Sequence, residues 1–178
     1  MKDWNIIAIA LPEREHFLLE KLKPFGQFQL TAFRGVLTGK ADDVAWFLND
    51  LRKAMDEDAE WTESLSRLLP MDQRFQFTLD TLEDQLAKAA TPLVGRMSDG
   101  TFYVRLEWRG PHLRITGPDQ ERALGDHLTA EAHRQGKTLH VSFDNPDYIV
   151  AAETVDDSGG VTLLSQDLRT RYSFVRVR

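Results

Sequence analysis

The sequence predicts an α+β (α/β) fold in two units, residues 1–80 and residues 81–178. Residues 101–109 alternate strictly between apolar and polar side chains, which is the period of a strand with one buried face. Apolar side chains recur every three or four positions in residues 42–55 and 119–134, which is the spacing of amphipathic helices. Both units therefore mix strands with helices, as a sheet covered by helices requires.

The first unit begins with a continuous apolar run, residues 4–11 (WNIIAIAL), which is bounded by charge and typical of a strand buried on both faces. Pro12 suits the first turn of a helix, and Pro24 ends that helix. Asp42 or Asp43 can cap the next one. The expected elements after the first strand are helix 13–22, strands 28–32 and 33–37, helix 42–55, a short helix over 61–68 that ends at Pro70, and strand 75–79.

With the short helix set aside, the order is strand, helix, strand, strand, helix, strand, which is the ferredoxin-like βαββαβ order. This order predicts one antiparallel sheet in residues 1–80, with both long helices on a single face and strand 75–79 inside that sheet. Because many unrelated functions use this arrangement, it indicates a fold and no activity.

The second unit is predicted to have a helix that buries side chains at a spacing of four and ends at Gly136, where a left-handed residue is favoured. If the alternation of residues 101–109 continues to the end of the strand, Trp108 is buried and Arg109 is exposed. The expected elements are helix 82–93, strand 101–109, helix 119–134, strands 138–143, 148–155 and 160–165, a hairpin turn at 157–160, and an edge strand at 172–177.

The chain is acidic, with 28 Asp and Glu against 22 Lys and Arg and a formal net charge of −6. That balance argues against sequence-blind nucleic-acid binding, which usually belongs to a basic domain. Arginines nevertheless gather in residues 101–117 and 165–178, which allows a positive face. The absence of Cys excludes disulfides and thiolate-held metals and favours a cytoplasmic location. No window approaches the roughly 20 apolar residues of a membrane span.

The sequence contains no Gly-rich phosphate loop, no paired-His metalloprotease helix and no nucleophile elbow. His127 and His133 are six residues apart on one predicted helix, so their rings point in different directions and do not form a metal pair. Glu153 and Asp157 could act as an acid–base pair, but nothing distinguishes them from ordinary surface carboxylates. We therefore expect no catalytic residues, no cofactor and no metal.

The polar face of strand 101–109 is the best candidate for binding. Arg105 and Arg109 lie four residues apart, about 13 Å along a strand, which would let them contact phosphates two nucleotides apart. Tyr103 on the same face can stack on an unpaired base, a contact of roughly 1–3 kcal/mol. The alternative is that Arg105 and Glu107 pair with neighbouring strands while Tyr103 covers the sheet.

Several short motifs, taken in order, resemble the THUMP family of RNA-modification modules. Arg109-Gly110 after the alternating strand is similar to the Arg-Gly end of the first THUMP strand, and Leu124-Gly125 resembles the core of the following helix. Residues 139–153 resemble the family's pattern of apolar strand, Asn-Pro-Asp, apolar strand and acid, and residues 160–164 its closing strand. Residues 66–72 (SRLLPMD) are similar to a connection in stand-alone THUMP proteins that assist tRNA cytidine acetylation.

The resemblance implies that the chain binds tRNA, at the acceptor stem and unpaired 3′ end, and presents it to a separate RNA-modification enzyme such as a cytidine acetyltransferase. Because the chain ends at Arg178 without room for a catalytic domain, we expect a non-catalytic, cytoplasmic adaptor for tRNA modification and processing. The alternative is a protein-interaction or small-ligand-sensing α/β module that no longer binds RNA. The expected RNA-binding residues are Tyr103, Arg105, Arg109, Gly110, His112, Arg114, Asn145, Arg169 and Arg171.

Overall fold

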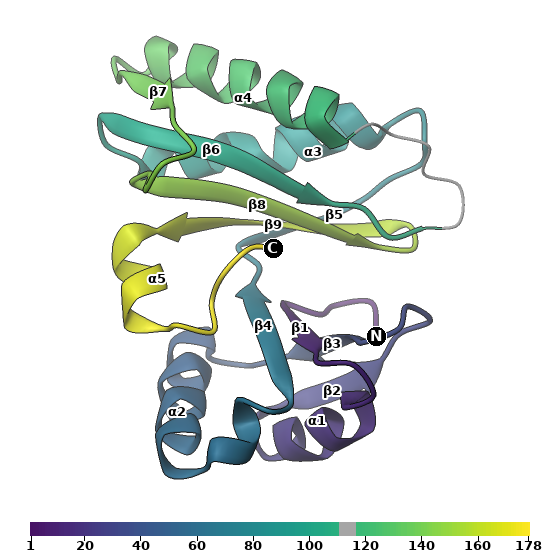
Figure 1. The fold of residues 1–178 in the computed structure, drawn as a ribbon. Coiled ribbons are helices and arrows are strands. Elements are labelled where there is room, and N and C mark those ends of the chain that lie inside the picture. The colour runs from purple at the N-terminus through teal and green to yellow at the C-terminus, as the bar shows by residue number, and fades with distance from the viewer. Residues whose placement is uncertain (111–116) are drawn as a thin grey trace. The chain divides into compact units, whose positions relative to one another are not determined.

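The computed structural model describes residues 1–110 and 117–178, which fall into two compact units (Figure 1). The first unit is residues 1–71 together with 168–178, and the second is residues 72–167. Each unit contains one sheet, so the mixed α+β class predicted from the sequence is confirmed. Within the described residues, no helix is both long and apolar enough to cross a membrane.

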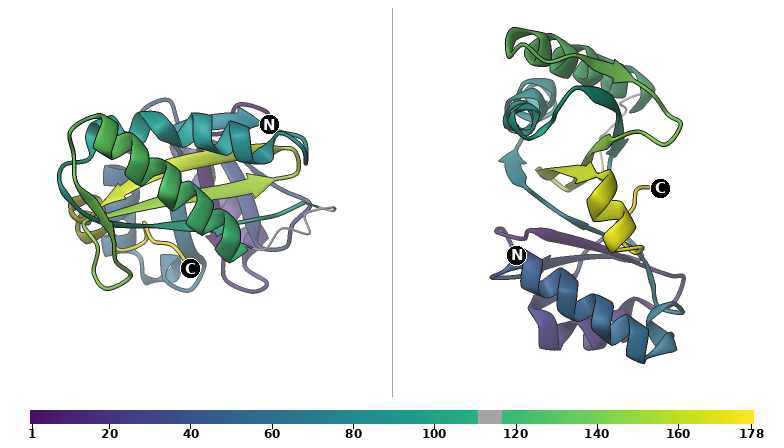
Figure 2. Two further views of the ribbon diagram at one scale, coloured as in Figure 1. Left: turned by 90° about the horizontal axis from the view of Figure 1, so that it is seen from above. Right: turned by 90° about the vertical axis from the view of Figure 1, so that its left-hand side faces the viewer.

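The first sheet has four strands in the order β2-β3-β1-β4, and all three pairings are antiparallel. Both long helices cover one face of this sheet, as Figure 2 shows most clearly in its right-hand view. The predicted βαββαβ order and the single helical face are therefore confirmed. The elements are β1 (Ile6–Ala10), α1 (Glu15–Leu22), β2 (Gln27–Leu30), β3 (Val36–Lys40), α2 (Val44–Glu57) and β4 (Leu65–Pro70), with single turns of 3₁₀ helix at Lys23–Phe25 and Ala59–Trp61.

Helix α2 begins where the sequence predicts. The Asp43 carboxylate accepts a hydrogen bond from the Trp46 backbone N–H at 2.9 Å, which satisfies one of the unpaired donors of the first turn. Phe47, Leu48 and Leu51 then follow at helical spacing and are buried. This buried stripe is what fixes α2 on the sheet, because most helical stability in proteins comes from packing of an apolar face.

A charged and aromatic cluster ties α1 to the turn that follows α2. The Lys21 ammonium contacts the Asp58 carboxylate, lies 3.3 Å from the Glu60 carboxylate, and sits 5.2 and 5.1 Å from the ring centres of Phe17 and Trp61. Burial lowers the pKa of Lys21, but hydrogen bonds to Asp58 and Glu60 outweigh it, so that pKa is raised. The hydrogen bond from Lys21, followed by one from the Glu60 backbone N–H, lowers the pKa of Asp58.

Two sequence predictions at the end of the first unit are wrong. Residues 65–70 form strand β4, which pairs with β1, whereas a short helix was predicted there. The predicted strand 75–79 lies at 73–76 as β5 (Gln73–Gln76) and pairs with the second sheet. The leucines of residues 65–69 fit a helical spacing as well as a strand, and their burial on both faces removes the alternation that would distinguish them.

The second sheet has five strands in the order β5-β9-β8-β6-β7. Strand β6 runs parallel to both of its neighbours, β7 and β8, whereas the β8–β9 and β9–β5 pairs are antiparallel. Helices α3 and α4 lie on one face of this sheet (Figures 1 and 2). The elements that follow β5 are α3 (Leu82–Ala90), a 3₁₀ segment (Thr91–Arg96), β6 (Gly100–Glu107), α4 (Gly117–Arg134), β7 (Leu139–Val141), β8 (Tyr148–Val155), β9 (Ser158–Ser165) and α5 (Gln166–Arg171).

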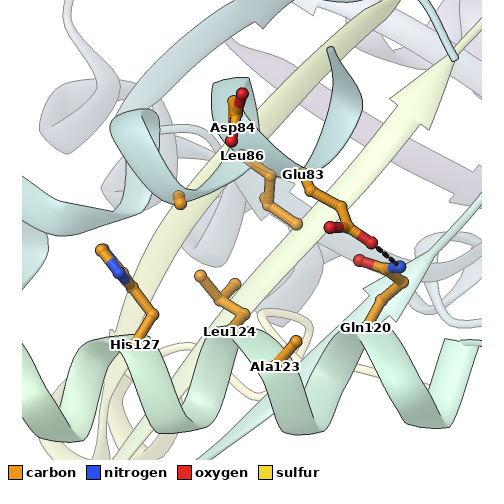
Figure 3. A pocket seen from close by; sticks show the side chains of 8 residues that line it. Glu83, Asp84, Leu86, Gln120, Ala123, Leu124 and His127 are labelled. Carbon is orange, nitrogen blue, oxygen red and sulfur yellow. Dashed lines mark hydrogen bonds between the residues drawn. The ribbon is translucent and has the colours of Figure 1, made fainter. Parts of the chain in front are cut away.

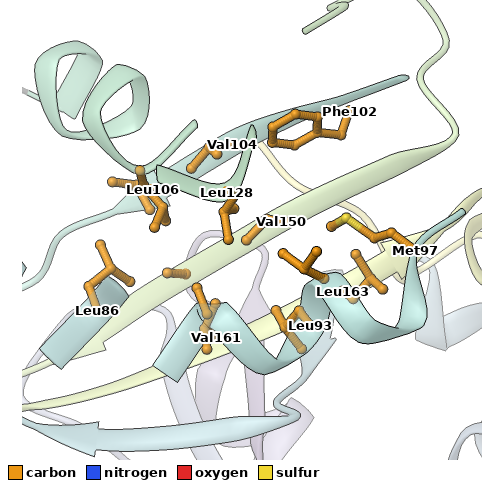
Figure 4. Close-up of a cluster of buried hydrophobic side chains, with 14 of the residues drawn as sticks. Leu86, Leu93, Met97, Phe102, Val104, Leu106, Leu128, Val150, Val161 and Leu163 are labelled. Carbon is orange, nitrogen blue, oxygen red and sulfur yellow. The ribbon is translucent and has the colours of Figure 1, made fainter. Parts of the chain in front are cut away.

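The core of the second unit lies between this sheet and its two helices (Figure 4). Leu124, Leu128 and Ala132 point into it at the predicted spacing of four, and Gly136 has a φ of 73°, as its position after the helix required. The strands contribute alternate residues, since each strand turns every second side chain toward the helices. The other large core side chains are Phe75, Phe77, Leu82, Leu86, Leu93, Val94, Met97, Phe102, Val104, Leu106, Leu139, Val150, Val161 and Leu163.

Two further local predictions are corrected. The β8–β9 turn is Asp156-Asp157, with Asp156 at a φ of 57°, and Gly159 lies inside β9. Gly159 is needed there because a Cβ would lie 2.2 Å from the Phe75 ring. The predicted edge strand 172–177 is a single bridge between Val175 and Leu68, because a turn, with the Val175 N–H donating to the Tyr172 carbonyl at 2.9 Å, takes up its first residues.

Candidate nucleic-acid interface

Strand β6 has the predicted alternation of buried and accessible residues. Phe102, Val104 and Leu106 are buried under α3 and α4, whereas Tyr103 and Arg105 are half-buried on the opposite face. Parallel pairing with β8 over residues 102–107 fixes this register, so a shift by one residue would exchange the two faces. Two of the three side chains predicted to face a ligand, Tyr103 and Arg105, are therefore on the same side of β6.

Two aromatic side chains, Tyr103 and Phe143, contact each other on the face of β6 that carries Arg105. The rings of Tyr103 and Phe143 have centres 5.4 Å apart and are tilted by 35°. Phe143 is 73% exposed and the neighbouring Val141 is 56% exposed, which is unusual for large apolar side chains. The Arg105 guanidinium lies 5.8 Å from the centre of the Tyr103 ring. Aromatic rings beside a guanidinium are the combination that binds unpaired nucleotides by stacking and charge.

The loop that carries Phe143 is held to β6 at both of its ends. At the first end, the Ser142 N–H donates to the Phe102 carbonyl at 3.0 Å. At the other end, the Asp147 carboxylate accepts from the Thr101 N–H at 2.8 Å and from the Thr101 hydroxyl at 2.9 Å. The Asn-Pro-Asp turn thus anchors the loop, and Phe143 is presented from a fixed backbone.

A groove of about 300 Å³ opens between β6, the first half of α4 and residues 141–143. We call it the β6 groove. Gly125 of α4 forms part of its floor, and a Cβ there would meet only Val104 Cγ2, at 3.9 Å. The groove carries the cation of Arg122 and the carboxylates of Glu121 and Asp126. Its lining residues are Phe102, Tyr103, Val104, Pro118, Glu121, Arg122, Gly125, Asp126, Val141 and Phe143.

Arg109 departs from the prediction. Its side chain is 14% exposed, and its guanidinium lies 2.6 Å from the carboxylate of Glu153, which is 2% exposed. Strand β6 ends at Glu107, so the alternation does not extend to Arg109, and Trp108 is only partly buried against the core. Arg109 is therefore the partner of a buried carboxylate within the sheet, and the prediction that it is largely exposed is wrong.

The remaining predicted residues are scattered. Gly110 lies at the end of the described segment, and His112 and Arg114 lie outside the described residues. Asn145 is exposed with a φ of 42°, and its side-chain oxygen accepts from Gln166 at 3.5 Å. Arg169 and Arg171 are on α5, in the residues that belong to the first unit, and each takes part in an interaction with another group.

A second hollow, of about 190 Å³, lies between α3 and α4 (Figure 3). Glu83 and Asp84 line one side of it, and His127 lies on the other, with its Nε2 2.8 Å from the Thr91 hydroxyl. The Gln120 amide donates to Glu83 across the hollow. Two carboxylates at its rim make this hollow unsuited to a phosphate, and within the described residues no group of three His, Asp or Glu side chains could hold a metal ion.

Comparison with known proteins gives a likeness in structure. No family model matches the chain, and no curated protein matches it. TrmN from Thermus thermophilus aligns over 89% of this chain and 44% of its own, with 19% identity and a TM-score of 0.57. A 4-thiouridine synthetase, solved with RNA and bound ATP, aligns over 92% of this chain and 42% of its own, with 11% identity and a TM-score of 0.54.

The THUMP domain of THUMP domain-containing protein 1 aligns over 52% of this chain and 92% of its own, but its TM-score of 0.39 (18% identity) is too low to carry weight. The chain spans less than half the length of TrmN and of the synthetase chain. At identities below 25% these likenesses concern the fold alone. The chain shares the fold of TrmN and of the 4-thiouridine synthetase over the aligned residues, and that fold is of the mixed α+β class that the sequence predicts.

Proposed function

We propose that this protein is a non-catalytic tRNA-binding adaptor, which holds the acceptor stem and unpaired 3′ end and presents the tRNA to a separate modification enzyme, such as a cytidine acetyltransferase. The observation that carries this proposal is the aromatic and cationic face of β6, where Tyr103, Arg105 and Phe143 meet.

The fold supports the same conclusion independently. One structural neighbour is a 4-thiouridine synthetase in complex with RNA, and it aligns over 92% of this chain, so the part of that protein that resembles this chain belongs to an RNA-binding enzyme. Most of the sequence motifs that resemble the THUMP family belong to the second unit, just after β6 and on α4, β7, β8 and β9. The motif of residues 66–72 instead falls mostly on β4 of the first unit. The choice of a cytidine acetyltransferase as an example of the partner enzyme rests on the sequence resemblance of residues 66–72 alone.

Of the expected RNA contacts, Arg105 is the one whose geometry fits a phosphate best. Its side chain is 39% exposed, and its nearest carboxylate, on Glu121, lies 3.9 Å away. An ion pair at that distance, with its arginine partly exposed, contributes little, so a phosphate can compete with it. Arg109 is no longer proposed as a phosphate contact, because its guanidinium is paired with the Glu153 carboxylate. His112 and Arg114 remain proposed contacts.

A protein-interaction module is the second candidate, because the exposed Phe143 and Val141 would also suit an apolar protein surface. Net charge also favours it, since a chain at −6 repels RNA at long range. Binding measurements separate the two candidates directly.

The test is the salt dependence of tRNA affinity for the wild type and for Arg105→Ala, measured by fluorescence anisotropy. Removing one phosphate-binding cation should flatten the slope of log affinity against log salt by about one unit. Arg134→Ala is the matched control, since Arg134 lies on the far half of α4 and pairs with Glu131. Absence of tRNA binding by the wild type at low salt, or identical slopes for wild type and Arg105→Ala, would contradict the proposal.

A further inference from the structure

We propose that the β6 groove receives a single unpaired RNA base, with Phe143 as its stacking surface and the backbone of Val104 as its hydrogen-bonding edge. This inference rests on the proposed RNA binding and names the subsite within it. Neither Phe143 nor Val104 belongs to the residues expected from the sequence.

The stacking surface is built before any ligand arrives. Phe143 is 73% exposed, yet its loop is tied to β6 through Ser142 and Asp147, and its ring rests on Tyr103. An exposed aromatic ring on a mobile loop would lose conformational entropy on binding, and a fixed one loses little. Stacking on such a ring tolerates any base, because every base has a π face.

The polar edge comes from the pairing of β6. In a strand, backbone groups of alternate residues point to the same side. On the side of β6 that pairs with β7, the Phe102 carbonyl accepts from Ser142, and the Leu106 N–H donates to the Glu121 carboxylate at 2.9 Å. Val104 lies between them, and its N–H and C=O on that side have no hydrogen bond from the described residues. One donor beside one acceptor is therefore left at the wall of the groove.

This edge is too short for a protein strand. Strand addition needs the open donors and acceptors of at least two alternate residues, and the carboxylate of Glu121 already occupies Leu106. A nucleobase needs only one such pair, because each base carries a donor next to an acceptor on its edge. A single open residue therefore favours a base over an extended peptide.

Charge around the groove fits the sugar–phosphate of that nucleotide. Arg122 is exposed at the rim, and Arg105 is beside Tyr103 with a buried Nε that has no hydrogen-bond partner among the described residues. Of the two acids, Glu121 is engaged with Leu106 and Arg105, and Asp126 remains. Two guanidinium groups thus lie beside a base-sized groove whose carboxylates, Glu121 and Asp126, come from α4.

The experiment compares two RNA probes, an acceptor-stem hairpin with an unpaired 3′ end and the same hairpin with abasic 3′ nucleotides. The wild type should bind the first about tenfold more tightly or better, since the abasic probe can neither stack on Phe143 nor bond to the Val104 edge. Phe143→Ala should bind both probes with nearly equal affinity, close to that of the wild type for the abasic probe. Gly125→Leu, which fills the groove from α4, should behave the same way, with folding checked by thermal unfolding.

Trp46→Ala is the matched control, because Trp46 is an exposed aromatic residue (52%) of the first unit, and it should keep the preference of the wild type. If the wild type binds both probes equally, the base subsite is refuted while RNA binding stands. If Phe143→Ala keeps the full preference for the base, the base lies elsewhere and the inference is again refuted. If the wild type binds neither probe at low salt, the proposed function and this inference fail together.

Discussion

Substitution of Arg109 should lower the free energy of unfolding more than substitution of any exposed arginine. Arg109→Ala leaves the Glu153 carboxylate, which is 2% exposed, without the guanidinium that lies 2.6 Å from it. Breaking a buried ion pair by deleting one partner typically costs about 3–5 kcal/mol, because the remaining charge stays out of water. Against a total stability of about 5–15 kcal/mol, this cost would be severe.

The assay is urea unfolding followed by circular dichroism and tryptophan fluorescence, with Arg105→Ala as the matched control. Arg105 is 39% exposed and its carboxylate partner is 3.9 Å away, so its removal should cost within about 0.5 kcal/mol. The double variant Arg109→Met with Glu153→Leu should recover most of the stability, since an apolar pair can replace a buried ion pair at little cost. An Arg109→Ala variant as stable as Arg105→Ala would refute the assignment of Arg109 to the core of the sheet.

Two more predictions concern folding stability. Because the pKa of Asp58 is lowered by the hydrogen bond from Lys21, the stability from this contact is present above the unfolded-state pKa of about 4 and disappears as pH falls through the lower folded-state value. Asp58→Asn should therefore make unfolding less sensitive to acid below pH about 4, and an unchanged acid profile would count against the contact. Gly159→Ala should destabilise by about 1–3 kcal/mol in urea unfolding, because its Cβ would lie 2.2 Å from the Phe75 ring; an unchanged midpoint would show that Phe75 moves freely.

Local sequence patterns correctly predicted the elements that have one buried face and one exposed face. The strand 101–109 and the helix 119–134 appear within two residues of their expected ends, because each has one buried face and one exposed face. Residues 65–70 escaped prediction because both faces of β4 are buried. The burial of a strand on two sides depends on tertiary packing, and a single sequence does not contain that information.

The candidate site was predicted in part for a related reason. Tyr103 and Arg105 follow from the alternation of one strand. Phe143 was missed, because its contact with Tyr103 depends on the parallel pairing of β6 with β7, which brings together residues forty positions apart. Arg109 was misassigned because its partner Glu153 comes from β8, through the register that aligns Glu107 with Glu153. Contacts between strands thus decided both the missed Phe143 and the misassigned Arg109. The only sequence signal for Phe143 was an apolar residue placed just after a short strand, where exposure is expected.

The most direct test of the proposed function is the affinity of the wild-type protein for intact tRNA and for the same tRNA with its unpaired 3′ nucleotides removed, at one fixed salt concentration. Stacking of an unpaired base contributes roughly 1–3 kcal/mol, so trimming should weaken binding by about 5- to 150-fold. Equal affinity for the two RNAs, or no binding to either, would contradict the proposal that this face of β6 holds the 3′ end of tRNA.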